Sequence, residues 1–341
     1  MQHYNFDVDI VIPWVDGSDK KWILEKNKYL DPEHQIDIDA HENRYRDWGN
    51  VQYIFRGIEK FAPWVHKVYF ITCGQIPKWM NINNEKLVLV NHKDYIPEEY
   101  LPTFSANPIE LNMHRIKGLS EHFIYMNDDF FFIKPVQKSD FFNKNGLPKI
   151  MAMEIPRPVS QNRIFDNICF NNVRVISSKF DKKKTKKAGK RNWYSLKNIP
   201  ALIINLVFDR LYRNQWSGFN ISHGPAPFLK SAINDCWADF NEELNATSSN
   251  KFRSINDVNQ YIFTEYLLCK NLFVQRKFRP KPSRLVSLKD ENLASACHMI
   301  EKQKYKAICL NDDLVTSFNV TRSIINKAFD KILPEKSSFE I

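Results

Sequence analysis

The sequence predicts an α/β fold with a mixed, mainly parallel sheet between layers of helices. Short apolar runs, rich in β-branched residues, have the length of buried strands, and the stretches between them carry apolar side chains at helical spacing. Strands that alternate with helices favour a sheet covered on both faces. The expected strands are residues 8–15, 67–72, 87–91 and 122–127, and the expected helices between them are residues 50–61 and 107–116.

The first strand is expected to end in a turn, because Asp16-Gly17-Ser18-Asp19 follows it. Ser18 or Asp19 can cap a helix that continues to about residue 30. Later in the chain, the patterns predict helices at residues 196–212, 225–244 and 257–271, a short strand at 272–278 and a late strand at 306–310.

The middle of the chain differs from the rest. Residues 178–192 read SKFDKKKTKKAGKRN, which is polar, basic and without periodicity, so we expect an exposed loop or a disordered insert. The helix at 196–212 could lie on a membrane surface, although core packing is the ordinary interpretation. We therefore divide the 341 residues into one α/β domain, formed by residues 1–155 and about 215–330, and a helical insertion at about 156–214 that contains the basic loop.

Composition narrows the range of partners. The net charge of +10 points to an anionic partner such as phosphate, nucleotide, polyanionic glycan or membrane surface, and no nucleic-acid-binding signature accompanies it. The six cysteines are scattered without a CxxC pair, which is typical of reduced thiols. Neither a signal-peptide pattern at the N-terminus nor an apolar run long enough to span a bilayer is visible. These features lead us to expect a cytoplasmic protein.

Acidic side chains stand where three predicted strands of one sheet end: Asp16, the pair Asp128 and Asp129, and the pair Asp312 and Asp313. Ligands of open α/β sheets bind beyond the carboxyl ends of the strands. Carboxylates there could hold Mg²⁺ or Mn²⁺ beside a substrate phosphate, or they could be ordinary caps and turn residues. Since neighbouring strand residues face opposite sides, only one of Asp128 and Asp129 should face a metal unless the strand turns there.

Three other residues could serve the same site. Gly17 permits close approach of a phosphate to the backbone, and Arg253 could clamp a phosphate with its planar guanidinium. His223, in Ser-His-Gly-Pro just before a predicted helix, could be a general base. Gly17 could also be an ordinary turn residue and Arg253 a solvated surface charge, and a histidine in a turn, such as His223, is more often structural; the same holds for His114.

Four regions of the chain together resemble the Stealth family of sugar-phosphate transferases. The first is DIVIPWVDGSD at 9–19, and the second runs from about 44 to 135 and includes RYRDWGN, LPTFSANPIE and HRIKGLSEHFIYMNDDFFF. The third is SHGPAPFLKS at 222–231 with NKFRSINDV at 250–258, and the fourth is CLND at 309–312. All four occur in the family's order and span most of the chain.

The resemblance implies a Rossmann-like, glycosyltransferase-like core. It implies transfer of a sugar 1-phosphate from a nucleotide-sugar donor to a hydroxyl of an acceptor glycan, which forms a phosphodiester in capsular or other surface polysaccharide synthesis. Contact with the inner membrane or with the capsule machinery stays open. So do two rival functions: a metal-dependent glycosyltransferase that forms a plain glycosidic bond, and a non-catalytic glycan-binding protein.

The same resemblance assigns roles to residues of this chain. The catalytic set is His223, Asp128 and Arg253, and the ligands of Mg²⁺ or Mn²⁺ are Asp128, Asp129 and Asp312. The substrate-binding set is Asp16, Gly17, Arg46, His114, Arg115 and Asn311.

Overall fold

The main sheet has five strands and is mostly parallel, which confirms the predicted fold class. The computed structural model describes residues 4–30, 38–39, 45–159, 163–279, 281, 283–313 and 315–341. In order across the sheet, the strands are β4 (Leu87–Asn91), β3 (Val68–Thr72), β1 (Val8–Pro13), β5 (His122–Tyr125) and β8 (Ala226–Leu229). The first four run parallel, and β8 pairs antiparallel with β5. All residues of β3 and nearly all of β1 are buried, as expected for central strands of a covered parallel sheet.

A second sheet holds the late acidic strand. It consists of β11 (Ser283–Leu288), β12 (Ala307–Asp312) and β6 (Phe130–Phe132), with β11 and β12 parallel and β6 antiparallel to β12. The acidic strand ends were expected in one sheet, and this was wrong for Asp312. Residues 126–129 carry the chain from the main sheet into β6, so the two sheets meet at the Asp128–Asp129 turn. Sequence periodicity did not reveal β6 and β11, because an apolar run does not specify the sheet it joins.

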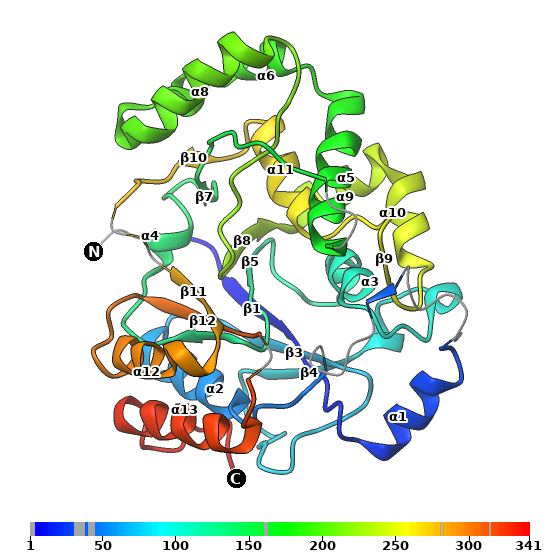
Figure 1. The fold of residues 1–341 in the computed structure, drawn as a ribbon, viewed down its shortest axis with the longest axis vertical. Helices are drawn as coiled ribbons and strands as arrows, with labels where there is room; N and C mark the ends of the chain where they lie inside the picture. The colour runs from blue at the N-terminus through cyan, green and yellow to red at the C-terminus, as the bar shows by residue number, and fades with distance from the viewer. Residues whose placement is uncertain are drawn as a thin grey trace.

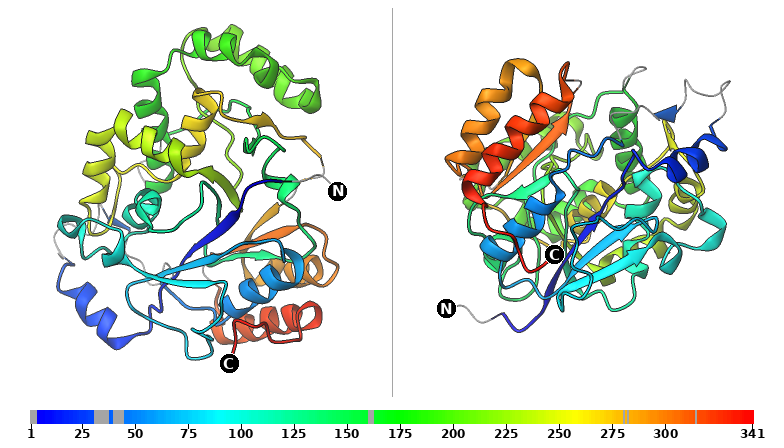
Figure 2. Two further views of the ribbon diagram at one scale, coloured as in Figure 1. Left: turned by 180° about the vertical axis from the view of Figure 1, so that it is seen from behind. Right: turned by 90° about the horizontal axis from the view of Figure 1, so that it is seen from below.

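Helices cover the sheets in two groups, which Figures 1 and 2 place on opposite sides of the main sheet. Helix α2 (Val51–Phe61) packs on β6, and α12 (Leu293–Glu301) packs on α13 (Phe318–Ile332) and on β11. The other group contains α3 (Ala106–Leu111), α5 (Ile164–Lys179), α9 (Lys230–Asp239), α10 (Asn241–Ser248) and α11 (Tyr261–Cys269). Further elements are α1 (Lys20–Asn27), α4 (Lys138–Phe141), η5 (Met113–Arg115) and the small pairs β2 (Ile38–Asp39) with β9 (Arg253–Ser254) and β7 (Lys149–Ile150) with β10 (Val274–Gln275).

Most expected elements of the first half form where the sequence placed them, but two later helices differ. The stretch expected as one helix at 225–244 begins as strand β8, because residues 226–229 pair with the edge of β5, and the chain then forms α9 and the start of α10. The turn that contains His223 therefore precedes a strand and not a helix. Helix α11 begins at Tyr261, four residues after the predicted start at residue 257. In the first half of the chain, α3 ends at Leu111, five residues before the predicted end at residue 116.

The basic segment was expected to be a loop or disordered, and this was wrong. It folds into the end of α5, then α6 (Lys182–Ala188) and α7 (Lys190–Trp193), ahead of α8 (Ile199–Tyr212). Lys182 and Lys186 are buried, and their Nζ atoms lie 2.9 and 2.5 Å from Glu154 Oε1, with Asp209 Oδ1 3.5 and 2.7 Å away. The two lysines share one helix face, and the acids that neutralise them come from distant segments. The domain boundaries at 155 and 215 stay a prediction.

Two other expectations concern the whole chain. All six cysteines are free thiols, as their spacing predicted. Among the described residues, no helix combines the length and apolar character needed to cross a bilayer.

Candidate functional site

A large cleft opens at the carboxyl ends of β1, β5 and β12. It contains about 1420 Å³ of empty space, including its open mouth. Because β3 lies on one side of β1 and β5 on the other, the cleft lies where the strand order reverses, the usual ligand position in such sheets. The charged and amide side chains that line it are Arg46, Asp47, Asn50, Glu110, Asn127, Asp128, Asp129, Arg253, Asn311 and Asp312.

Asp128 and Asp129 both line this cleft. Strand β5 ends at Tyr125 and the chain turns, so the alternation that would have separated the two side chains no longer applies. Burial, the neighbouring Asp129 and Asp47 raise the pKa of Asp128 to about 8. Burial also raises the pKa of Asp129, whose Oδ1 is buried without a hydrogen-bond partner. Uncompensated buried carboxylates favour a proton or a cation at this turn.

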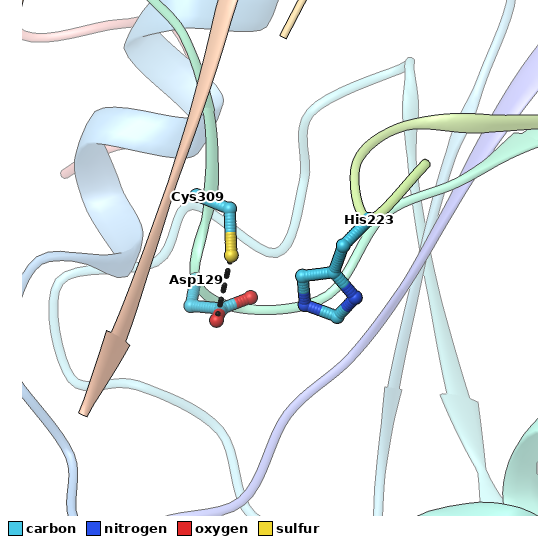
Figure 3. A group of neighbouring side chains, drawn as sticks. All are labelled: Asp129, His223 and Cys309. Atoms are coloured by element: carbon cyan, nitrogen blue, oxygen red, sulfur yellow. Dashed lines mark hydrogen bonds between the residues drawn. The ribbon is translucent and has the colours of Figure 1, made fainter. Parts of the chain in front are cut away.

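His223 lies beside Asp129 and Cys309 (Figure 3). One ligand atom from each of the three side chains lies within 4.8 Å of the others, and the Cys309 thiol donates to Asp129 Oδ2 at 3.1 Å. His223 Nδ1 is 2.6 Å from the Tyr261 hydroxyl, and its other ring nitrogen points towards the Asp129 carboxylate in Figure 3. Burial lowers the pKa of His223 while Asp129 opposes the shift, so the ring is neutral near neutral pH.

Arg46 and Asp312 form a forked ion pair at the rim of the same cleft. Arg46 Nε donates to Asp312 Oδ2 at 3.0 Å and Nη2 donates to Oδ1 at 2.8 Å. The Arg46 guanidinium also lies 4.6 Å from the centre of the Phe318 ring. Such a bidentate pair fixes the direction of the guanidinium. Asn311 lines the cleft next to the pair.

Arg253 reaches the cleft from β9, where it faces Glu110. Burial raises the pKa of Glu110 to about 7, and the Tyr125 hydroxyl and Arg253 partly oppose this shift. Sequence reasoning did not single out Glu110, Asp47 or Tyr261. A signal was available for Glu110, since it is an acid on the predicted buried face of a short helix, and such an acid needs a partner.

Asp16 and Gly17 are not among the residues that line the cleft. Asp16 Oδ1 accepts from the Ser18 N–H and hydroxyl at 2.9 and 2.6 Å. At Gly17 a Cβ atom would stand 2.0 Å from the Tyr45 carbonyl oxygen, so glycine is required by a chain crossing. The Asp19 carboxylate caps the start of α1, because Oδ1 accepts from the Lys21 and Trp22 N–H groups at 2.8 and 3.4 Å. These two N–H groups therefore already donate to a carboxylate of the chain and are not free to bind a phosphate.

His114 and Arg115 also lie away from the cleft. Both pack on Trp237, with ring centres 5.4 Å apart for His114 and the Arg115 guanidinium 4.8 Å from the ring. Burial lowers the pKa of His114 to about 3. The structure thus brings together Arg46, Asp128, Asp129, Arg253, Asn311 and Asp312, with His223 next to Asp129, and does not bring in Asp16, Gly17, His114 or Arg115.

Three regions of the chain match models of a known protein family. Residues 6–33, 44–150 and 222–266 match the models of Stealth protein conserved regions 1, 2 and 3. All three regions include residues that line the cleft, and the third also includes His223.

Full-length relatives support the match. The chain is 38% identical over 344 residues to the receptor polysaccharide phosphotransferase WefC of Streptococcus oralis, with 98% of this chain and 99% of the relative covered. It is 37% identical over 343 residues to the capsular polysaccharide phosphotransferase WcwK of Streptococcus pneumoniae, with 98% and 99% covered. It is 35% identical over 342 residues to the exopolysaccharide phosphotransferase cps2G of Lactiplantibacillus plantarum, with 98% and 96% covered. Identity of this extent, together with three matched regions around one cleft, shows that the chain belongs to the Stealth family.

Proposed function

We propose that this protein is a polysaccharide phosphotransferase that moves a sugar 1-phosphate from a nucleotide sugar to a hydroxyl of an acceptor glycan. The observation that carries the proposal is the placement of His223 beside Asp129, at the edge of a cleft that also holds Arg46 and Arg253. Relatives that match the chain almost end to end are named polysaccharide phosphotransferases. Its free cysteines fit a reducing cytoplasm, where we place it.

In the proposed reaction the acceptor hydroxyl oxygen attacks the phosphorus atom next to the sugar. The bond from that phosphorus to the leaving nucleoside monophosphate breaks, and a sugar phosphodiester forms. His223 takes the hydroxyl proton. For this, its Nδ1–H donates to the Tyr261 oxygen and its Nε2 carries the free lone pair. Asp129 stabilises the imidazolium that results.

Arg253 and Arg46 supply positive charge for the donor phosphates. Guanidinium groups match phosphate oxygens in pairs, and Arg253 already faces the cleft from β9. Arg46 is held at the rim by Asp312, so its direction is set before substrate arrives. Charge placed in advance at the transferring phosphoryl group stabilises the transition state.

The residues present fit a hard divalent cation, Mg²⁺ or Mn²⁺. Asp128 and Asp129 are adjacent, half-buried acids, and the buried Oδ1 of Asp129 lacks a hydrogen-bond partner. When bound, the ion would add positive charge beside the donor phosphates. Asp312 has both oxygens on Arg46 and would have to release it in order to bind the ion. The Cys309 thiol, which donates to Asp129 Oδ2, is a soft ligand that a hard cation does not prefer.

The reaction type is tested by a donor screen. The purified protein is incubated with a panel of nucleotide sugars, a glycan acceptor and Mg²⁺, and the released nucleotide and the phosphorus NMR spectrum of the product are measured. We expect a nucleoside monophosphate and a phosphodiester resonance. A plain glycoside with released nucleoside diphosphate would instead assign a metal-dependent glycosyltransferase, and tight glycan binding without turnover of any donor would assign a binding protein.

A further inference from the structure

Helix α8 turns its apolar side chains towards the outside of the molecule. Ile199, Ile203 and Leu206 lie three and four residues apart, so they form one stripe along the helix. Their exposed fractions are 56%, 55% and 55%. The stripe is extended by other exposed apolar side chains: Leu196 before the helix, and Val207 and Leu211 within it. An exposed apolar area of this kind marks a binding surface.

The inner face of α8 buries the small Ala201 and the polar Asn205 and no large apolar side chain, unlike a helix packed on a core. Asn205 is fully buried and donates to the carbonyl oxygens of Ala152 and Trp193 at 2.9 and 3.0 Å. Its Oδ1 accepts from the Glu154 N–H at 3.0 Å, and Asp209 one turn later accepts from Lys186 at 2.7 Å. These hydrogen bonds fix the orientation of the helix about its own axis. The helix cannot turn its apolar stripe inwards without leaving buried polar groups unpaired.

The segment that contains the stripe also carries many exposed cations. Helices α6 and α8 lie together at the outer end of the molecule, at the top of Figure 1. Within residues 181–215, all of which the structure describes, the exposed basic residues are Lys183, Lys184, Lys187, Lys190, Arg191, Lys197, Arg210 and Arg213. The acids of the same segment are Asp181, which is exposed, and Asp209, which pairs with Lys186. The exposed side chains of this segment therefore combine an apolar stripe with a strong excess of positive charge.

We propose that α8, with the cations of α6 and α7, docks this protein on a membrane that contains anionic lipids. The apolar stripe would enter the boundary between headgroups and acyl chains, and the lysines and arginines would meet lipid phosphates. With 14 residues the helix is about 21 Å long, so it would lie along the surface. A second copy of the chain fits less well, because symmetric pairing through α8 would bring the two sets of cations together. The proposal goes beyond the proposed enzymatic function and does not rest on it, because lipid binding is measured without turnover.

Vesicle sedimentation with the full chain tests this docking. One set of vesicles contains phosphatidylcholine alone, and the other contains equal parts of phosphatidylcholine and phosphatidylglycerol. We expect the wild-type protein to sediment with the mixed vesicles, and to do so less at high salt because salt screens the cations. The double variant Ile203→Gln/Leu206→Gln should weaken the binding by about tenfold or more, since two exposed side chains of the stripe no longer enter the bilayer.

The matched control is Val320→Gln/Ile324→Gln on α13, at the other end of the molecule in Figure 1. Val320 and Ile324 are also exposed apolar side chains of one helix, with exposed fractions of 59% and 39%, and their replacement should leave vesicle binding unchanged. Equal thermal unfolding of the two double variants and the wild type verifies their folding, as expected for exposed positions. Failure of the wild type to bind mixed vesicles, or equal binding by the α8 variant, would overturn the proposal. Dimers in sedimentation velocity that the α8 variant loses, without vesicle binding, would assign the surface to a second copy instead.

Discussion

Replacing Lys186 with methionine would test whether the buried charge cluster holds the helical region together. Lys186 Nζ lies 2.5 Å from Glu154 Oε1 and 2.7 Å from Asp209 Oδ1, and Glu154 is completely buried. Lys182 makes the second contact to Glu154 at 2.9 Å. The ammonium group of Lys186 also lies 5.2 Å from the centre of the Trp193 ring. Methionine keeps most of the aliphatic stem and removes the charge.

The size of the effect follows from what remains charged. Removing one partner of a buried ion pair costs about 3–5 kcal/mol, because the other charge stays buried without compensation. Here Glu154 keeps Lys182, and Asp209 is partly exposed and can regain water. We therefore expect a loss near the lower end, about 3 kcal/mol in the free energy of unfolding.

Urea unfolding followed by tryptophan fluorescence measures this loss, since Trp193 and Trp216 lie next to the Lys186 ammonium group. Lys187, the next residue in the sequence, is exposed, and Lys187→Met is the matched control with an expected change within about 0.5 kcal/mol. If the two variants had the same urea midpoint, the charge of Lys186 in the buried cluster would stabilise the fold no more than the charge of the exposed Lys187.

Three further predictions concern the cleft and its surroundings. His223→Gln should lower the turnover number by about 100-fold or more with unchanged thermal unfolding, since a general base contributes this much; turnover near the wild-type value would remove His223 from the mechanism. Mg²⁺ at about 100 times its dissociation constant should stabilise the wild type by about 2.7 kcal/mol. This gain should vanish in Asp128→Asn and persist in the control Asp313→Asn; a gain retained in Asp128→Asn would place the ion elsewhere. Burial lowers the pKa of His92 from 6.5 to about 4, so its contribution to stability is fully present above pH 6.5 and is lost as the pH falls towards 4, by about 3 kcal/mol. In urea titrations across this range His92→Gln should lose less stability than the wild type, and parallel curves would contradict the assignment.

The early part of the fold could be predicted from local patterns. Residues 8–13, 68–72 and 87–91 form strands where the β-branched runs predicted them, and α2 forms on the predicted apolar spacing. Burial of a strand or of one helix face depends mainly on its own side chains, so periodicity is sufficient there. The split of residues 225–244 into a strand and helices was missed because it depends on an edge of β5 more than 100 residues earlier.

The candidate site was predicted in part. Asp128, Asp129 and Asp312 follow strands in the sequence, and ligands of α/β sheets bind at such ends. That both neighbouring acids reach one cleft depends on the turn into β6, and that Asp312 meets Arg46 depends on a contact between residues 266 positions apart. Glu110 and Tyr261 gained significance only from the side chains that they contact.

The sequence by itself determined the alternation of strands and helices, the acids at strand ends and the motifs that place the chain in its family. These are properties of residues that are close together in the sequence, so they can be recognised without knowledge of the fold. Only the tertiary structure decided which charges are buried. In the run KKKTKK, Lys182 and Lys186 are neutralised inside by Glu154 and Asp209, while Lys183, Lys184 and Lys187 face solvent. The physical reason is that a charge can be buried only beside a partner, and here the partners come from segments that the sequence does not place next to it.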